Sequence, residues 1–177
     1  MGCGKSSVGR RLSELLCCPF MDLDLVIEEQ VGRSIAEIFA SDGEAAFRQM
    51  ELDALRSIIL GNSCESVEKQ SVPQPHSKAL VLSLGGGVVM TPECAELVKE
   101  NTLCIYLRTS VDTLVERLTD EAASRPLLNT GTPLRHRIET LMTRRTSTYE
   151  ATAHHIIDTD GISVDELAHS IISVINR

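Results

Sequence analysis

The chain opens with Met1-Gly2-Cys3-Gly4-Lys5-Ser6-Ser7, and this stretch decides the fold. It matches the second half of a phosphate-binding loop, whose full pattern is a glycine, four further residues and then Gly-Lys-Ser/Thr. Gly2 and Gly4 let the backbone turn its N–H groups toward an anion. Lys5 supplies a positive charge for phosphate oxygens, and the Ser6 hydroxyl can bind Mg²⁺. The leading glycine and the strand that delivers such a loop would precede Met1, so we expect the natural chain to begin roughly ten residues earlier.

Alternating strands and helices follow this loop. The apolar spacing of Val8, Leu12 and Leu15 predicts a helix directly after it. We expect strands at about 17–21, 79–84, 102–107 and 155–158, and further helices at about 26–31, 34–39, 47–60, 92–101, 110–118, 134–150 and 164–175. This order predicts an α/β fold: one three-layer, doubly wound domain over residues 1–177 with a parallel sheet.

Composition narrows the function classes. Apolar residues make up 42% of the 177 residues and charged residues 24%, which is typical of a folded domain with a real core. A net charge of −8 and the absence of tryptophan argue against a nucleic-acid partner. No apolar run approaches the ~20 residues of a membrane span. The six cysteines lack metal-ligand spacing, so we expect reduced thiols in a cytoplasmic protein.

Two segments interrupt the alternation. Residues 62–78 are polar and rich in Pro, Ser and Gln, which is typical of a surface insertion, and we assign them no function. Residues 119–133 contain Gly, Pro and polar residues, which favours a moving lid. Arg125 lies in this second segment, where closure could bring it to a phosphoryl group, although a solvated loop arginine is the commoner reading.

Acidic and glycine residues follow two of the predicted strands. Asp22 and Asp24 come after the first, and Gly85-Gly86-Gly87 after the second. Loops at the carboxyl ends of parallel strands share one edge of the sheet, where ligands bind, so these residues should face the phosphate loop. One carboxylate could hold Mg²⁺ through water while the other accepts a proton from an attacking hydroxyl. The alternative is that both aspartates cap the following helix.

Two arginines are candidates for binding an anionic substrate. Arg145 continues the apolar stripe of Ile138, Leu141 and Met142, whereas its neighbour Arg144 does not. A guanidinium on a core-facing stripe needs an anionic partner, which is either a ligand or a buried Asp or Glu. Arg48 has Glu51 one turn further on to hold it, as in an ordinary surface ion pair.

Taken together, these residues resemble the shikimate kinases, small phosphate-loop kinases of the nucleoside monophosphate kinase type. The matching stretches span nearly the whole chain in order: 2–10, Asp22-Leu23-Asp24, 32–39, 43–48 with Glu51, 84–87, Arg125-Pro126-Leu127-Leu128 and 145–149.

The resemblance implies ATP-dependent phosphorylation of shikimate at its 3-hydroxyl, with Mg²⁺ as cofactor and with Lys5, Asp24 and Arg125 as catalytic residues. Its implied ATP-binding residues are Gly2, Cys3, Gly4, Lys5, Ser6, Ser7 and Arg125. Its implied shikimate-binding residues are Asp24, Arg48, Gly85, Gly86, Gly87 and Arg145. The helices within about 24–60 are likewise implied to bind the substrate. It also implies that Ser6 ligates the metal directly and that Asp22 does so through water. Arg117 resembles an arginine that stacks on adenine in some relatives, although its spacing to Arg125 departs by about one residue.

Two other functions stay open at this point. A gluconate-type or nucleotide-type kinase could use the same fold, but the Arg48/Arg145 pair and the triple glycine suit a small carboxylated ring. A nucleotide-binding relative without activity would also carry the loop, although intact Lys5, Ser6 and both aspartates argue against a decayed site. We expect a monomer that binds ATP and shikimate.

Overall fold

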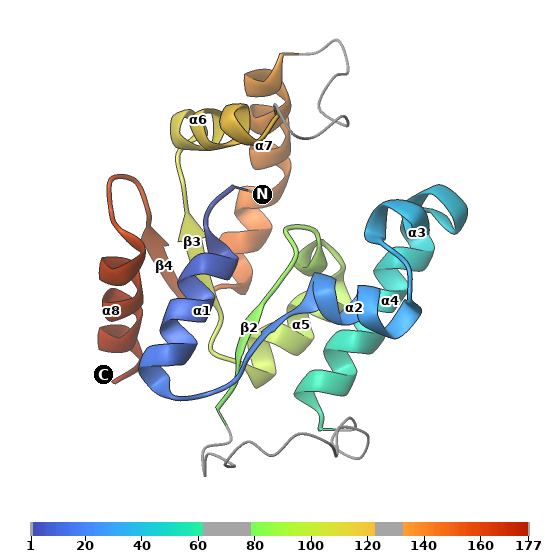
Figure 1. The fold of residues 1–177 in the computed structure, drawn as a ribbon, viewed down its shortest axis with the longest axis horizontal. Coiled ribbons are helices and arrows are strands. Elements are labelled where there is room, and N and C mark those ends of the chain that lie inside the picture. The colour runs from blue at the N-terminus through green and yellow to red at the C-terminus, as the bar shows by residue number, and fades with distance from the viewer. Residues whose placement is uncertain (1, 62–78, 123–132, 177) are drawn as a thin grey trace.

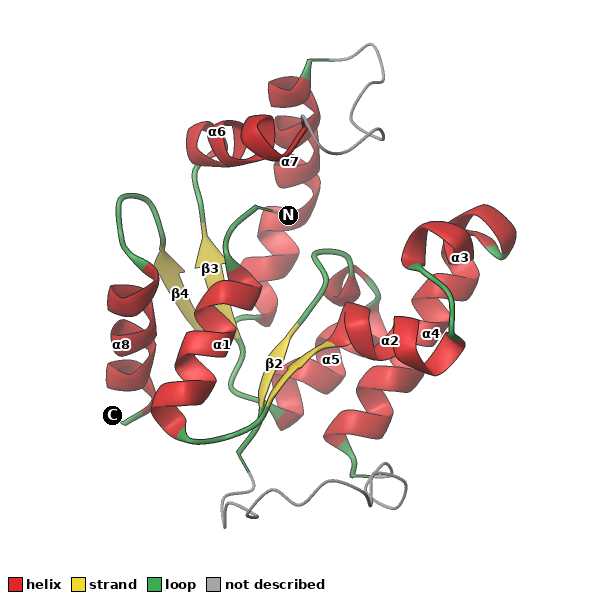
Figure 2. Cartoon of the chain, in the orientation of Figure 1, coloured by secondary structure: helices red, strands yellow, loops and turns green. Residues whose placement is uncertain are grey.

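The computed structural model describes residues 2–61, 79–122 and 133–176. Its helices are α1 Lys5–Leu16, α2 Leu23–Val31, α3 Ile35–Ser41, α4 Gly43–Ile59, α5 Pro92–Asn101, α6 Val111–Ala122, α7 Leu134–Thr152 and α8 Val164–Ile175 (Figure 1). Its strands are β1 Phe20–Asp22, β2 Val81–Ser83, β3 Ile105–Arg108 and β4 His155–Asp158 (Figure 2). A short 3₁₀ turn covers Val88–Met90.

The four described strands form two parallel pairs. Strand β1 pairs with β2, placing Asp22 opposite Ser83, and β3 pairs with β4, placing Arg108 opposite Asp158. Within the described residues, β2 and β3 share no hydrogen-bonded ladder. The parallel α/β class expected from the sequence is confirmed, and the described parallel strands are arranged in two pairs. All four strands end toward the same side of the molecule, where the loops that carry the candidate residues lie (Figure 2).

Three apolar clusters hold the elements together. The largest joins α2, α3, α4 and α5 with the 3₁₀ turn, and its fully buried members include Leu23, Ile38 and Leu55. A second cluster packs α1 against α8 through Val8 and Leu167. These two helices lie side by side in Figure 1. The third joins α6 to α7. None of the described helices is long and apolar enough to cross a membrane.

Local sequence signals explain several helix ends. Ser34 with Glu37 and Ser163 with Glu166 form capping boxes at the starts of α3 and α8. Gly32 ends α2 in the left-handed conformation, with φ 68°.

Some expected boundaries need adjustment, and three predicted features lie outside the described residues. Helix α2 begins at Leu23, about three residues early, so Asp24 lies in its first turn and not at a strand end. Helix α6 continues to Ala122, so residues 119–122 are helical and not part of a loop. The remainder of the expected lid up to 132, the insertion at 62–78 and Arg125 lie outside the described residues.

Candidate active site

The phosphate loop leads directly into α1. Gly2 and Gly4 both have positive φ, 71° and 80°, which a residue with a side chain rarely adopts. Gly4 is the residue before the helix, so the first free N–H groups of α1 face the loop. Arg117 of α6 donates to the Gly2 carbonyl at 3.3 Å, and its guanidinium also lies 3.9 Å from where a Cβ on Gly4 would be. The loop therefore has the form of an anion-binding site, and the Arg117 guanidinium lies next to it.

Hydroxyl and carboxylate oxygens near Lys5 could serve as ligands for a magnesium ion. The Ser6 hydroxyl donates to Asp22 Oδ2 at 2.8 Å. Ser83, opposite Asp22 in the β1–β2 register, is buried, and its hydroxyl has no partner among the described residues. The described residues contain no cluster of three or more His, Cys, Asp or Glu that could hold a metal. Hydroxyl and carboxylate oxygens in small number suit Mg²⁺, which keeps waters and takes phosphate oxygens as its other ligands.

Asp22 also shapes the start of α2. Its second oxygen, Oδ1, accepts from the Asp24 N–H at 3.2 Å, so Asp22 is the N-cap. The capping alternative therefore holds for Asp22, alongside its bond to Ser6. It does not hold for Asp24, which lies inside the helix.

The carboxyl group of Asp24 is half-buried between other charged groups. Burial raises its pKa, and the nearby charges of Asp22 and Glu28 raise it further, while Lys5 and Arg48 act in the opposite direction. A carboxylate with a raised pKa beside a lysine is well suited to accept a proton.

The triple-glycine loop packs against three of these charged side chains. A Cβ on Gly85 would lie 2.8 Å from Asp24 Oδ1 and 3.4 Å from Glu51 Oε1. A Cβ on Gly87 would lie 2.5 Å from Arg48 Nη1. A side chain at either position would displace these groups, so the glycines allow the loop after β2 to lie against Asp24, Glu51 and Arg48.

Arg48 is held by two carboxylates of its own helix. Its Nη1 donates to Glu51 at 2.5 Å and its Nη2 to Glu44 at 3.0 Å. The Glu51 side chain is 2% exposed, whereas that of Glu44 is 69% exposed. Burial raises the pKa of Glu51, while Arg48 acts against this rise. Glu51 is therefore an internal counter-ion, and Glu44 is a surface partner.

Arg145 lies on the inward side of α7, as expected. It is half-buried while Arg144 is exposed. No ion pair joins Arg145 or Lys5 to a carboxylate in the part of the chain whose side chains are described. The buried-ion-pair alternative for Arg145 is thus not observed there, and both cations are available to an anionic ligand.

Two residues of the site are not among the predicted ones. Ser83 belongs to an apolar strand, and a single hydroxyl in the run Leu80–Leu84 directly before three glycines is a usable signal for it. Tyr149 lies in one of the stretches that match the family, and its hydroxyl donates to the Gly86 carbonyl at 2.5 Å.

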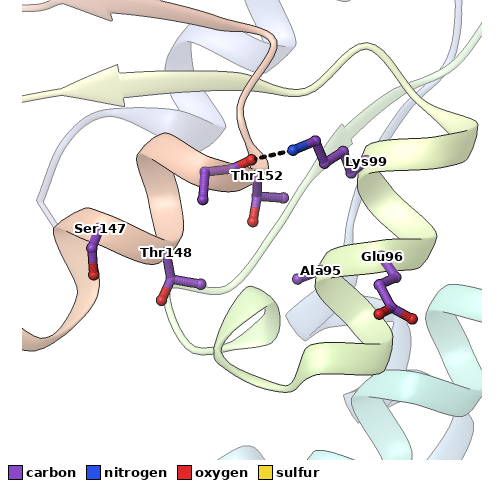
Figure 3. A pocket seen from close by; sticks show the side chains of 7 residues that line it. Ala95, Glu96, Lys99, Ser147, Thr148 and Thr152 are labelled. Carbon is purple, nitrogen blue, oxygen red and sulfur yellow. Dashed lines mark hydrogen bonds between the residues drawn. The ribbon is translucent and has the colours of Figure 1, made fainter.

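A separate shallow pocket between α5 and α7 contains none of the predicted residues (Figure 3). There Lys99 donates to the Ala151 carbonyl at 2.7 Å.

Comparison with known proteins gives the family. The family model described as shikimate kinase matches residues 1–176. The chain belongs to the shikimate kinase family. A shikimate kinase of Zymomonas mobilis is 39% identical over 177 residues, which cover 100% of this chain and 90% of that protein. One of Salinibacter ruber is 38% identical, covering 99% of this chain and 80% of that protein.

A solved structure of the same family has the same fold. The shikimate kinase from Acinetobacter baumannii, whose structure is described as a complex with shikimate, superposes with a TM-score of 0.82. It is 33% identical, and the match covers 99% of this chain and 88% of that one. The shikimate kinase fold therefore extends over essentially the whole chain.

Proposed function

We propose that this chain transfers the γ-phosphoryl group of ATP to the 3-hydroxyl of shikimate, producing ADP and shikimate 3-phosphate on the route to chorismate and the aromatic amino acids. The observation that carries the proposal is the meeting of Asp24, Glu51 and Arg48 at the triple-glycine loop. Family membership supports it, and so does the Acinetobacter baumannii relative described as bound to shikimate.

The acceptor site suits a small ring that carries a carboxylate and hydroxyls. Arg48 and Arg145 would bind the carboxylate, since guanidinium groups match its planar geometry. The backbone of Gly85–Gly87 would lie along the ring, where side chains are excluded. Asp24 would accept hydrogen bonds from the ring hydroxyls. Glu51 would keep Arg48 in place from the buried side.

The donor site comprises the phosphate loop and the start of α1. Backbone N–H groups from Gly2 to Ser7 would surround the β- and γ-phosphates, with Lys5 as their counter-charge. Arg117, above the loop, would lie near the nucleotide. Mg²⁺ would be held by the Ser6 hydroxyl and, through water, by Asp22. The Ser83 hydroxyl, which has no partner among the described residues, would be available to a bound water. Bound Mg²⁺ supplies positive charge to the phosphates.

Asp24 would act at the oxygen that attacks. It accepts the 3-hydroxyl proton as the new O–P bond forms and the bond from γ-phosphorus to the β-phosphate oxygen breaks. Lys5 stabilises the charge that develops on the phosphoryl oxygens, while Arg48 and Arg145 fix the ring. Positioning and charge stabilisation supply most of the acceleration in such reactions.

A coupled assay of ADP release tests the proposal against its competitors. The purified chain with Mg²⁺ and ATP should turn over with shikimate and not with gluconate or nucleoside monophosphates. Asp24→Asn should lower kcat with shikimate by about a hundredfold or more, because a general base typically contributes 10²–10⁴-fold. It should leave ATP binding within about threefold. Near-normal turnover in the Asp24→Asn variant would show that Asp24 is not the general base. Turnover of the unchanged chain with gluconate alone would favour a gluconate-type kinase.

The same proposal includes cytoplasmic location and a monomer. All the groups named above come from one chain, so a second copy is not needed to complete the site. Light scattering coupled to gel filtration should give the mass of a single chain, 19.4 kDa. A dimer mass would contradict this part alone.

A further inference from the structure

Tyr149 connects α7 to the triple-glycine loop. Its hydroxyl donates to the Gly86 carbonyl at 2.5 Å. It lies four residues after Arg145, and therefore on the same face of α7. Burial raises the pKa of Tyr149. The nearby Arg145 guanidinium lowers this pKa, both through its charge and through a hydrogen-bonding interaction with the Tyr149 hydroxyl. At neutral pH the phenol remains protonated and serves as a donor.

The Tyr149 ring is itself fixed by a second tyrosine. Tyr106 of β3 packs against it with ring centroids 5.1 Å apart and planes tilted by 51°. The Tyr106 hydroxyl is buried and has no partner among the described residues. The two packed tyrosines thus differ in one respect: only the Tyr149 hydroxyl is bonded to the loop.

The glycine loop is contacted from two directions. On one side Gly85 faces Asp24 and Glu51, and Gly87 faces Arg48. On the other, the Tyr149 hydroxyl donates to the carbonyl of Gly86, the glycine between these two. These contacts connect the loop to α2 and α4 on one side and to α7 on the other.

We propose that Tyr149 is a positioning residue that fixes the triple-glycine loop relative to Arg145, so that both present their shikimate contacts in one geometry. This inference rests on the proposed function, because it assigns both groups to the same substrate. Tyr149 acts through Gly86 and Arg145, and it is not placed in contact with the reacting atoms.

The pair Tyr149→Phe and Tyr106→Phe tests the proposal. Each removes one hydroxyl from the same packed pair and keeps both rings. Tyr149→Phe should raise the KM for shikimate about threefold to tenfold, as expected for one lost hydrogen bond, with the KM for ATP within twofold. Tyr106→Phe should leave both constants unchanged, since its hydroxyl has no partner among the described residues. A KM for shikimate that is unchanged in Tyr149→Phe, or raised equally in both variants, overturns the proposal.

Backbone hydrogen exchange of the free protein supplies a readout that is independent of substrate. Amides of the 84–90 segment should exchange faster in Tyr149→Phe than in the unchanged chain, and not in Tyr106→Phe. Faster exchange without any phosphorylation of shikimate by the unchanged chain would defeat the proposed function and keep the loop contact. Equal exchange in both variants would defeat the positioning role itself.

Discussion

Arg48 shows how burial separates two similar ion pairs. Both Glu44 and Glu51 bind its guanidinium, but only the Glu51 carboxylate is removed from water. An exposed pair contributes about 0–1 kcal/mol, whereas loss of a buried partner leaves a charge without compensation. Glu51→Gln should therefore raise the KM for shikimate about tenfold or more and lower Tm by several degrees.

The matched variant is Glu44→Gln on the same helix. It should change the KM for shikimate by less than about threefold and leave Tm almost unchanged. Steady-state kinetics and thermal unfolding measure both variants together. Equal effects from the two substitutions would show that the buried position of Glu51 is not what holds Arg48.

The protonation of Asp24 should determine the acidic side of the pH profile of kcat/KM for shikimate. Its pKa is raised by burial and by Asp22, with a further contribution from Glu28. A base works ionised, so kcat/KM for shikimate should be lost as pH falls through this raised pKa. Glu28→Gln keeps the oxygen that accepts from the Ile35 N–H at 2.8 Å but removes the charge. The acidic limb should then move to lower pH, and a shift to higher pH would contradict the assignment.

The triple-glycine loop leaves space for the Arg48 guanidinium at Gly87. A methyl group on Gly87 would displace the Arg48 guanidinium, because the Cβ would come within 2.8 Å of three of its atoms. Gly87 has φ −104°, so space and not backbone strain is being tested. Gly87→Ala should raise the KM for shikimate about tenfold or more and leave the KM for ATP within twofold.

A glycine elsewhere provides the control for that substitution. A Cβ on Gly9, within α1, would lie 2.6 Å from the Phe20 ring, so Gly9→Ala also forces a neighbour to move. It should alter Tm while leaving the KM for shikimate within twofold. Selective loss of shikimate binding in this variant, or loss of ATP binding in Gly87→Ala, would argue against the loop as a substrate contact.

Elements were predictable from sequence where the signal was local. The capping boxes at Ser34 and Ser163 and the strand His155–Asp158 needed only near neighbours. The predicted start of α2 is wrong because Asp22 serves both as the N-cap of this helix and as the partner of Ser6, sixteen residues away. The pairing of Ser83 with Asp22 and the bond from Tyr149 to Gly86 could not be predicted from neighbouring residues, since each joins segments that are distant in sequence.

The candidate site draws its residues from elements of all three apolar clusters. Lys5 and Ser6 begin the helix of the α1–α8 cluster, whereas Asp24 and Arg48 come from the helices of the largest one. Arg145 and Arg117 belong to α7 and α6, which form the third. In a chain with a net charge of −8, we propose that these cations supply the local positive charge for two anionic ligands.

The product formed from shikimate and ATP decides whether the chain has the proposed activity. Phosphorus NMR of the chain with Mg²⁺, ATP and shikimate should show ADP and a phosphate ester on the 3-oxygen of shikimate in equal amounts. Release of ADP with free phosphate only, or no loss of ATP under conditions where the chain is folded, would contradict this activity.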